Sequence, residues 1–119
     1  SSQGNLSGAI DAFREATKRN PSYSDAWANM GIALYNNSSY LEAIQAFDKC
    51  TSIDRTNKCI YYAKGLAYEK LGNRSEANKA YGKAGFGENA SKKWEVCKSN
   101  FTVSMPPLPD LNRESFIKH

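Results

Sequence analysis

The stretch that decides the fold of this chain spans residues 24–57 and reads SDAWANMGIALYNNSSYLEAIQAFDKCTSIDRTN. Apolar side chains recur in it at the three- and four-residue spacing of one helix face, first through residues 24–37 and again through residues 41–53. Between the two segments stands Asn37-Ser38-Ser39, and both residue types favour turns. The pattern therefore predicts two helices joined by a short turn.

The same pattern returns when the sequence is shifted by 34 residues in either direction. A fixed period of about 20 to 50 residues is typical of solenoids, in which each unit buries its apolar face against the next. The sequence therefore predicts an all-α solenoid of helix-turn-helix repeats. The aligned sets are Ala9 with Ala43 and Ala77, Phe13 with Phe47 and Tyr81, Ala16 with Cys50 and Ala84, Gly31 with Gly65, and Trp27 with Tyr61.

These positions resemble the tetratricopeptide repeat family, whose pattern is an aromatic residue, Leu-Gly, Tyr, then Ala, an aromatic residue and Pro. Two whole repeats match, and the first is present only as a second half that ends at Pro21. Lys64 departs from the pattern, because the family usually has Leu there. The resemblance implies about 2.5 repeats of antiparallel helix pairs, stacked in a right-handed superhelix with a concave, partner-binding face.

The repeats also divide the chain. We expect a repeat domain over residues 1–102 and, after it, a Pro-containing tail over residues 103–119 whose Pro-dense start is unfavourable for a helix. Three glycines predict that the second helix of the last repeat frays near Ala84. After these glycines, apolar residues at helical spacing predict a helix that caps the last repeat. The expected parts of the domain are a half repeat 4–23, repeats 24–57 and 58–91, and a capping helix 90–101 with Ala90, Trp94, Cys97 and Phe101 on its apolar side.

Polar residues before the helices predict their N-caps. Ser39 followed three residues later by Glu42 is a capping-box pattern, and Asn5 and Asn73 stand at the equivalent position of their repeats.

Gly31 and Gly65 fall inside helices, where glycine costs about 1 kcal/mol relative to alanine. We expect them to allow a close approach of the paired helix at Ala43 and Ala77.

Residue types needed for catalysis or metal binding are scarce. The single histidine is His119, so the fold lacks an internal Ser-His-Asp triad or a His-based metal site. The three cysteines fit no zinc spacing. Cys50 reads as a packed core residue, whereas Cys59 and Cys97 fall on successive first helices, where a disulfide is conceivable but not required by any spacing. We predict a non-enzymatic protein without a cofactor.

The charge is uneven along the chain. Residues 1–57 carry five Lys or Arg and six Asp or Glu, whereas residues 58–119 carry eleven and six. The basic half raises nucleic-acid binding as a hypothesis, but its lysines belong to several faces, and we regard this as unfavoured. No apolar run approaches the roughly 18 residues of a membrane helix. The lysines in question are Lys58, Lys64, Lys70, Lys92, Lys93 and Lys98.

The resemblance implies that the first helix of each pair lines the concave groove. There we expect a non-catalytic protein–protein interaction module that binds a peptide segment of its partner. The alternative is a structural or self-assembly scaffold, in which copies join through the exposed N-terminal edge or the C-terminal tail. The predicted groove residues are Asp25, Asn29, Ile32, Tyr35, Asn36, Cys59, Tyr62, Ala63, Leu66 and Lys70.

The sequence N-x-[ST] occurs six times. Chance predicts about 1.5 occurrences from eleven Asn and seventeen Ser or Thr among 119 residues. Asn and Ser are also favoured in turns that cap helices, so the motif has a purely structural explanation. The sequence favours a cytoplasmic location, with export as the alternative that these sequons leave open. They begin at Asn5, Asn36, Asn37, Asn73, Asn89 and Asn100.

Overall fold

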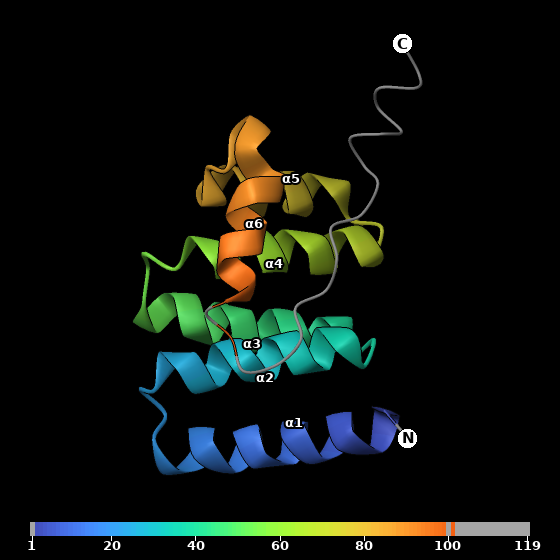
Figure 1. Cartoon of the computed structure of the whole chain (residues 1–119), viewed down its shortest axis with the longest axis vertical. Helices are drawn as coiled ribbons and strands as arrows, with labels where there is room; N and C mark the ends of the chain where they lie inside the picture. The colour runs from blue at the N-terminus through green and yellow to red at the C-terminus, as the bar shows by residue number, and fades with distance from the viewer. Residues whose placement is uncertain (1, 100, 102–119) are drawn as a thin grey trace.

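The computed structural model describes residues 2–99 and 101, with side chains from Leu6 onward. Every regular element in this part of the chain is helical, as the sequence predicted (Figure 1). The first five helices lie one above another in a stack, whereas the last α-helix runs across the stack in front of α4 (Figure 1). The helices are α1 (Ser2–Arg19), α2 (Ser24–Asn36), α3 (Tyr40–Ile53), α4 (Lys58–Lys70), α5 (Arg74–Ala84), the 3-10 helix η1 (Gly87–Asn89) and α6 (Ala90–Lys98).

The core follows the repeat positions. Ala43, Phe47 and Cys50 of α3 are fully buried, as are the aligned Ala77 and Ala84 of α5. The ring of Phe47 lies against Gly31 in the first helix of its own pair. Burial of apolar surface stabilises the fold by about 25 cal/mol per Å² removed from water. The 34-residue period therefore corresponds to one helix pair, which is the packing unit of the fold.

The first helix of the chain keeps its corresponding face partly open. Ile10 is buried, whereas Ala9, Phe13 and Ala16 remain half-buried. Those three residues align with the fully buried Ala43, Phe47 and Cys50 of α3. Within the described residues, α1 thus lacks the partner helix that covers the same face of α3 and α5.

The two helical glycines accommodate aromatic rings. A Cβ atom at Gly31 would clash with the ring of Phe47, and one at Gly65 would clash with the ring of Tyr81. We expected these glycines to face Ala43 and Ala77 of the paired helix. The nearest side chains are instead the rings of Phe47 and Tyr81, so the expected contact was wrong. The rings lie across the helix pair and need the volume that any side chain would occupy.

The predicted caps are partly confirmed. The side-chain oxygen of Asn73 accepts a hydrogen bond from the Glu76 backbone N–H at 3.2 Å, as an N-cap does. Ser39 is the residue before α3, but its side chain makes no cap bond, so the capping box was wrong. Glu42 is instead paired with Arg14 of α1 at 2.9 Å. Asn5 lies inside α1, which begins at Ser2.

Helix α5 ends at Ala84, where the sequence predicted it to fray. Gly85 then adopts φ 66°, the left-handed conformation that favours glycine and stops a helix. The short η1 turns the chain back, so that α6 crosses the stack rather than continuing it (Figure 1). The predicted tail over residues 103–119 lies outside the described residues. No helix in the described part is long and apolar enough to cross a membrane.

Candidate functional site: the concave face and helix α6

Helix α6 lies over the first helix of the last repeat. A disulfide joins Cys59 of α4 to Cys97 of α6, with 5.8 Å between the Cα atoms. Ala90, Trp94 and Cys97 are buried, and Phe101 is half-buried, so the predicted apolar stripe of this segment is confirmed. Helix α6 therefore covers the last repeat, as predicted, and it does so on the side where the groove was expected.

An aromatic cluster anchors α6 on α4. The ring of Tyr62 stacks on Phe86 with 5.0 Å between centroids, and it lies 5.5 Å from the ring of Trp94. The Tyr62 ring also lies near Tyr81 of α5, with 4.7 Å between the ring centroids. Trp94 is almost completely buried. Burial of large aromatic rings in this arrangement contributes both apolar area and about 0.5–1.5 kcal/mol per ring pair.

The predicted groove residues therefore fall into three classes of exposure. Five of them are buried, and the four apolar ones belong to the same cluster as Trp94 and Cys97, against which Phe101 packs. Tyr62 is half-buried among the rings, and Cys59 is half-buried in its disulfide. The remaining three residues form an exposed rim. The buried five are Asn29, Ile32, Tyr35, Ala63 and Leu66, and the exposed three are Asp25, Asn36 and Lys70.

Asn29 is held by its own helix. Its side-chain Nδ2 donates a hydrogen bond to the backbone oxygen of Asp25 at 2.9 Å. This bond directs the amide along α2 and fixes its orientation. Asp25 is thus exposed and Asn29 buried, although they stand only one turn apart on α2.

Burial also shifts the acid–base behaviour of the face. Desolvation raises the pKa of Tyr35 to about 12, with a smaller effect from the neighbouring Tyr40. Desolvation likewise raises the pKa of Tyr62, and Glu69 adds to the shift. Both phenols stay neutral at physiological pH, so they act as apolar surface with a hydroxyl group and not as acids or bases.

The free thiol of Cys50 is buried. Burial raises the pKa of Cys50 to about 12, and Asp54 and Asp25 add to the effect. The thiolate is the reactive form, so this residue cannot compete for the disulfide. Among the described residues no cluster of His, Cys, Asp or Glu gathers to hold a metal ion.

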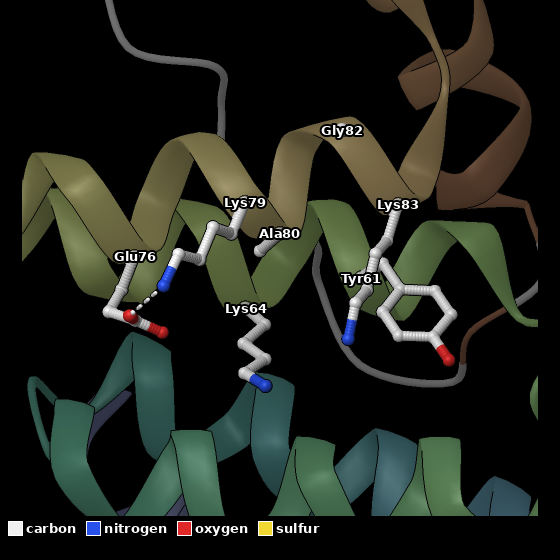
Figure 2. A pocket seen from close by; sticks show the side chains of 7 residues that line it. All are labelled: Tyr61, Lys64, Glu76, Lys79, Ala80, Gly82 and Lys83. Carbon is white, nitrogen blue, oxygen red and sulfur yellow. Dashed lines mark hydrogen bonds and ion pairs between the residues drawn. The ribbon is translucent and has the colours of Figure 1, made fainter.

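A cleft of about 360 Å³ lies between α4 and α5 (Figure 2). Lys64, which departs from the repeat pattern, forms an ion pair with Asp48 of α3 at 2.6 Å. Lys79 pairs with Glu76 at 3.1 Å. Two of the three lysines here are thus already neutralised, and the cleft is less suited to an anion than its lysine count indicates. Its lining is Tyr61, Lys64, Glu76, Lys79, Ala80, Gly82 and Lys83.

Sequence reasoning left the pairing of Cys59 with Cys97 open and did not place α6 across α4. The signal was present, because both cysteines stand on the apolar stripes of their helices. Phe86 was missed altogether, since it follows the glycine that ends α5 and belongs to no periodic pattern.

Known proteins share the repeats and the fold. Two family models, both described as tetratricopeptide repeat, match residues 1–56 and 60–84. Small glutamine-rich tetratricopeptide repeat-containing protein 2 of Mycosarcoma maydis is 30% identical over 70 residues, which are 59% of this chain and 20% of that protein. The peroxisomal targeting signal receptor of Kluyveromyces lactis is 32% identical over 63 residues, 53% of this chain and 11% of that receptor. The chain therefore spans a fifth or less of these relatives.

Solved structures agree. Two crystal structures of MamA are 35% and 31% identical to this chain, with TM-scores of 0.67 and 0.65. They cover 75% and 86% of it, and each match takes in 52% of the MamA chain. Sequence models, helix order and burial at the repeat positions lead to the same conclusion: the chain belongs to the tetratricopeptide repeat family.

Proposed function

We propose that the chain is a non-catalytic protein-binding module whose concave face receives a short amphipathic helix with an aromatic anchor. Members of this family generally act as interaction modules. A relative named as a receptor for a targeting signal supports recognition of a protein segment. The single observation that carries the proposal is α6 itself, whose Trp94 is buried against Tyr62 on the predicted groove helix.

Helix α6 has the features that helix-in-groove recognition requires. It presents Ala90, Trp94 and Cys97 at spacings of four and three, which is the spacing of anchor residues on one helix face. Its opposite side carries exposed Lys92, Lys93 and other polar groups. A partner helix of the same design would compete with α6 for the face. The disulfide favours the closed form, because it ties α6 to α4.

The proposal is tested with a labelled peptide of residues 87–101 in which Cys97 is replaced by Ser. Fluorescence anisotropy measures its binding to the full chain carrying Trp94→Ala and Cys97→Ser, which lacks both anchors of its own α6. We expect saturable binding to this open variant and weaker binding to the oxidised wild type, in which the disulfide ties α6 to α4. Reduced wild type serves as a second open sample, and circular dichroism confirms that each chain is folded.

A matched pair of substitutions locates the contact. Tyr62→Ala added to the open variant should weaken binding about tenfold or more, because truncation of a central aromatic anchor costs at least about 2 kcal/mol. Tyr23→Ala, which removes an exposed tyrosine from the α1–α2 turn, should leave affinity unchanged. A folded open variant that does not bind the peptide, or equal binding by the oxidised wild type, contradicts the proposal.

The second candidate is self-assembly through the N-terminal edge. It is favoured by Ala9, Phe13 and Ala16 of α1, which remain half-buried although the aligned residues of α3 are fully buried. A helix from another copy could cover this face, as α2 covers that of α3. Sedimentation of the full chain tests it: mass that rises with concentration and is lost on Phe13→Glu supports assembly, and a strict monomer rejects it.

A further inference from the structure

We propose that this chain is N-glycosylated, with the exposed Asn36, Asn73 and Asn89 as acceptors, and that it matures in an oxidising compartment. Two unrelated observations lead there. One is the excess of N-x-[ST] sequences over the number that composition predicts. The other is the disulfide between Cys59 and Cys97, a bond that persists outside the reducing cytosol.

The structural explanation of the sequons accounts for the asparagines but not for the residues that follow them. Asn73 caps α5 through its oxygen, so its presence in the turn has a purely structural reason. Ser75, which completes the sequon, is exposed, and its hydroxyl makes no hydrogen bond to the described residues. The same holds for Ser91, two residues after Asn89. The fold needs neither hydroxyl, whereas an Asn-linked glycan requires both.

Ser38 gives the strongest form of this argument. It adopts φ 63°, a left-handed conformation that side chains other than glycine disfavour. The aligned residue in the next repeat is Gly72, with φ 79°. Local structure therefore favours glycine at residue 38, yet the chain carries the serine that completes the sequon of Asn36.

The acceptor positions are open to a transferase and leave the fold intact. Asn36 and Asn73 stand beside the α2–α3 and α4–α5 turns, which lie at the same edge of the stack (Figure 1). Asn89 is exposed before α6, and its side chain makes no cap bond. Asn37 is less suitable, because it is half-buried and its Nδ2 donates to Ser39 Oγ at 3.4 Å. A glycan on Nδ2 of Asn73 leaves the capping oxygen free to accept its bond.

The transfer requires a lipid-linked oligosaccharide diphosphate as donor. Nδ2 of the asparagine forms a bond to the anomeric carbon of the first sugar. The bond from that carbon to the donor's diphosphate oxygen breaks, the lipid diphosphate leaves with the electron pair, and one Nδ2 proton is released. The serine two residues later is the part of the acceptor that defines the site.

The test uses the full chain purified from the cells that produce it. Its intact mass is measured before and after peptide-N-glycosidase digestion in ¹⁸O-labelled water, which converts each glycosylated asparagine to labelled aspartate. We expect a mass above that of the polypeptide, lost on digestion, with the label at residues 36, 73 and 89. A chain of polypeptide mass, or one without label at these residues, overturns the proposal.

Two variants and a thiol measurement sharpen the result. Ser75→Ala should abolish the label at Asn73, and Ser75→Thr should retain it, while both keep the capping asparagine and the same melting temperature. Alkylation of free thiols at the moment of lysis should leave Cys59 and Cys97 unmodified. Alkylated Cys59 and Cys97 would show that the chain resides in a reducing compartment and would overturn the second half of the proposal.

Discussion

At the scale of single residues, replacement of a packed helical glycine and of an open one should have opposite effects on stability. Gly31→Ala places a Cβ atom against the Phe47 ring and should destabilise the fold by about 1–3 kcal/mol. Gly82→Ala in α5 meets no neighbouring atom within 4 Å and should stabilise it by about 0.5–1 kcal/mol. Urea titration followed by circular dichroism measures both. Equal effects of the two substitutions would contradict the packing described here.

Removal of the Tyr81 hydroxyl should stabilise the fold. Its hydroxyl is buried and finds no hydrogen-bond partner among the described groups, whereas the aligned Phe47 carries no hydroxyl. Burying an unsatisfied hydroxyl costs about 1–3 kcal/mol. Tyr81→Phe should therefore raise the free energy of unfolding by about 1 kcal/mol, and Tyr23→Phe at an exposed position should leave it unchanged. A loss of stability in Tyr81→Phe would show that the hydroxyl is satisfied.

Tyr35 predicts how stability depends on alkaline pH. Its pKa is raised from an ordinary value of 10.0 to about 12 by burial, so the unfolded chain loses this proton first. The contribution of the neutral Tyr35 to the free energy of unfolding is complete below pH 10 and declines as the pH rises toward 12. Melting temperatures between pH 8 and 12 should fall above pH 10, and Tyr35→Phe should fall less steeply. Parallel curves for the two chains would contradict the assignment.

At the scale of helices, the disulfide connects α4 to α6. It closes a loop with a sequence separation of 38 residues, for which chain entropy predicts about 4 kcal/mol of stabilisation, often less in practice. Cys97→Ser should therefore lower the free energy of unfolding by about 2–4 kcal/mol and speed amide exchange in α6. Reductant should have the same effect on the wild type and none on the variant. Sensitivity of the variant to reductant would contradict this account.

The sequence predicted the helices because the signals for each helix lie within or beside that helix. The helical spacing of apolar residues, the turn residues and Gly85, which ends α5, all act within a few residues. The bounds of α2, α3 and α5 agree with these signals. The position of α6 depends instead on a reversal at η1 and on Phe86, which no period contains. Ser39 failed as a capping box for a similar reason, since Glu42 pairs with Arg14 from another helix.

At the scale of the whole molecule, the sequence predicts which residues share the face of the candidate site. It does not predict that α6 covers this face. Repeat spacing places Ile32, Tyr62 and Leu66 on one side of the stack, and this required no long-range information. The enclosure of Tyr62 depends on Phe86 and Trp94, about 30 residues further along the chain, and local patterns do not encode the route of that segment over α4. The face is consequently occupied by the protein's own helix in the oxidised form.

Amide hydrogen exchange of the folded open variant (Trp94→Ala with Cys97→Ser), measured with and without the peptide of residues 87–101, shows which helices the peptide contacts. If the concave face binds a helix of the α6 type, the peptide should slow exchange in α2 and α4 and leave the α5 side of the cleft at Lys79 and Lys83 unchanged. Protection confined to that cleft or to α1, with none in α2 and α4, would contradict the account.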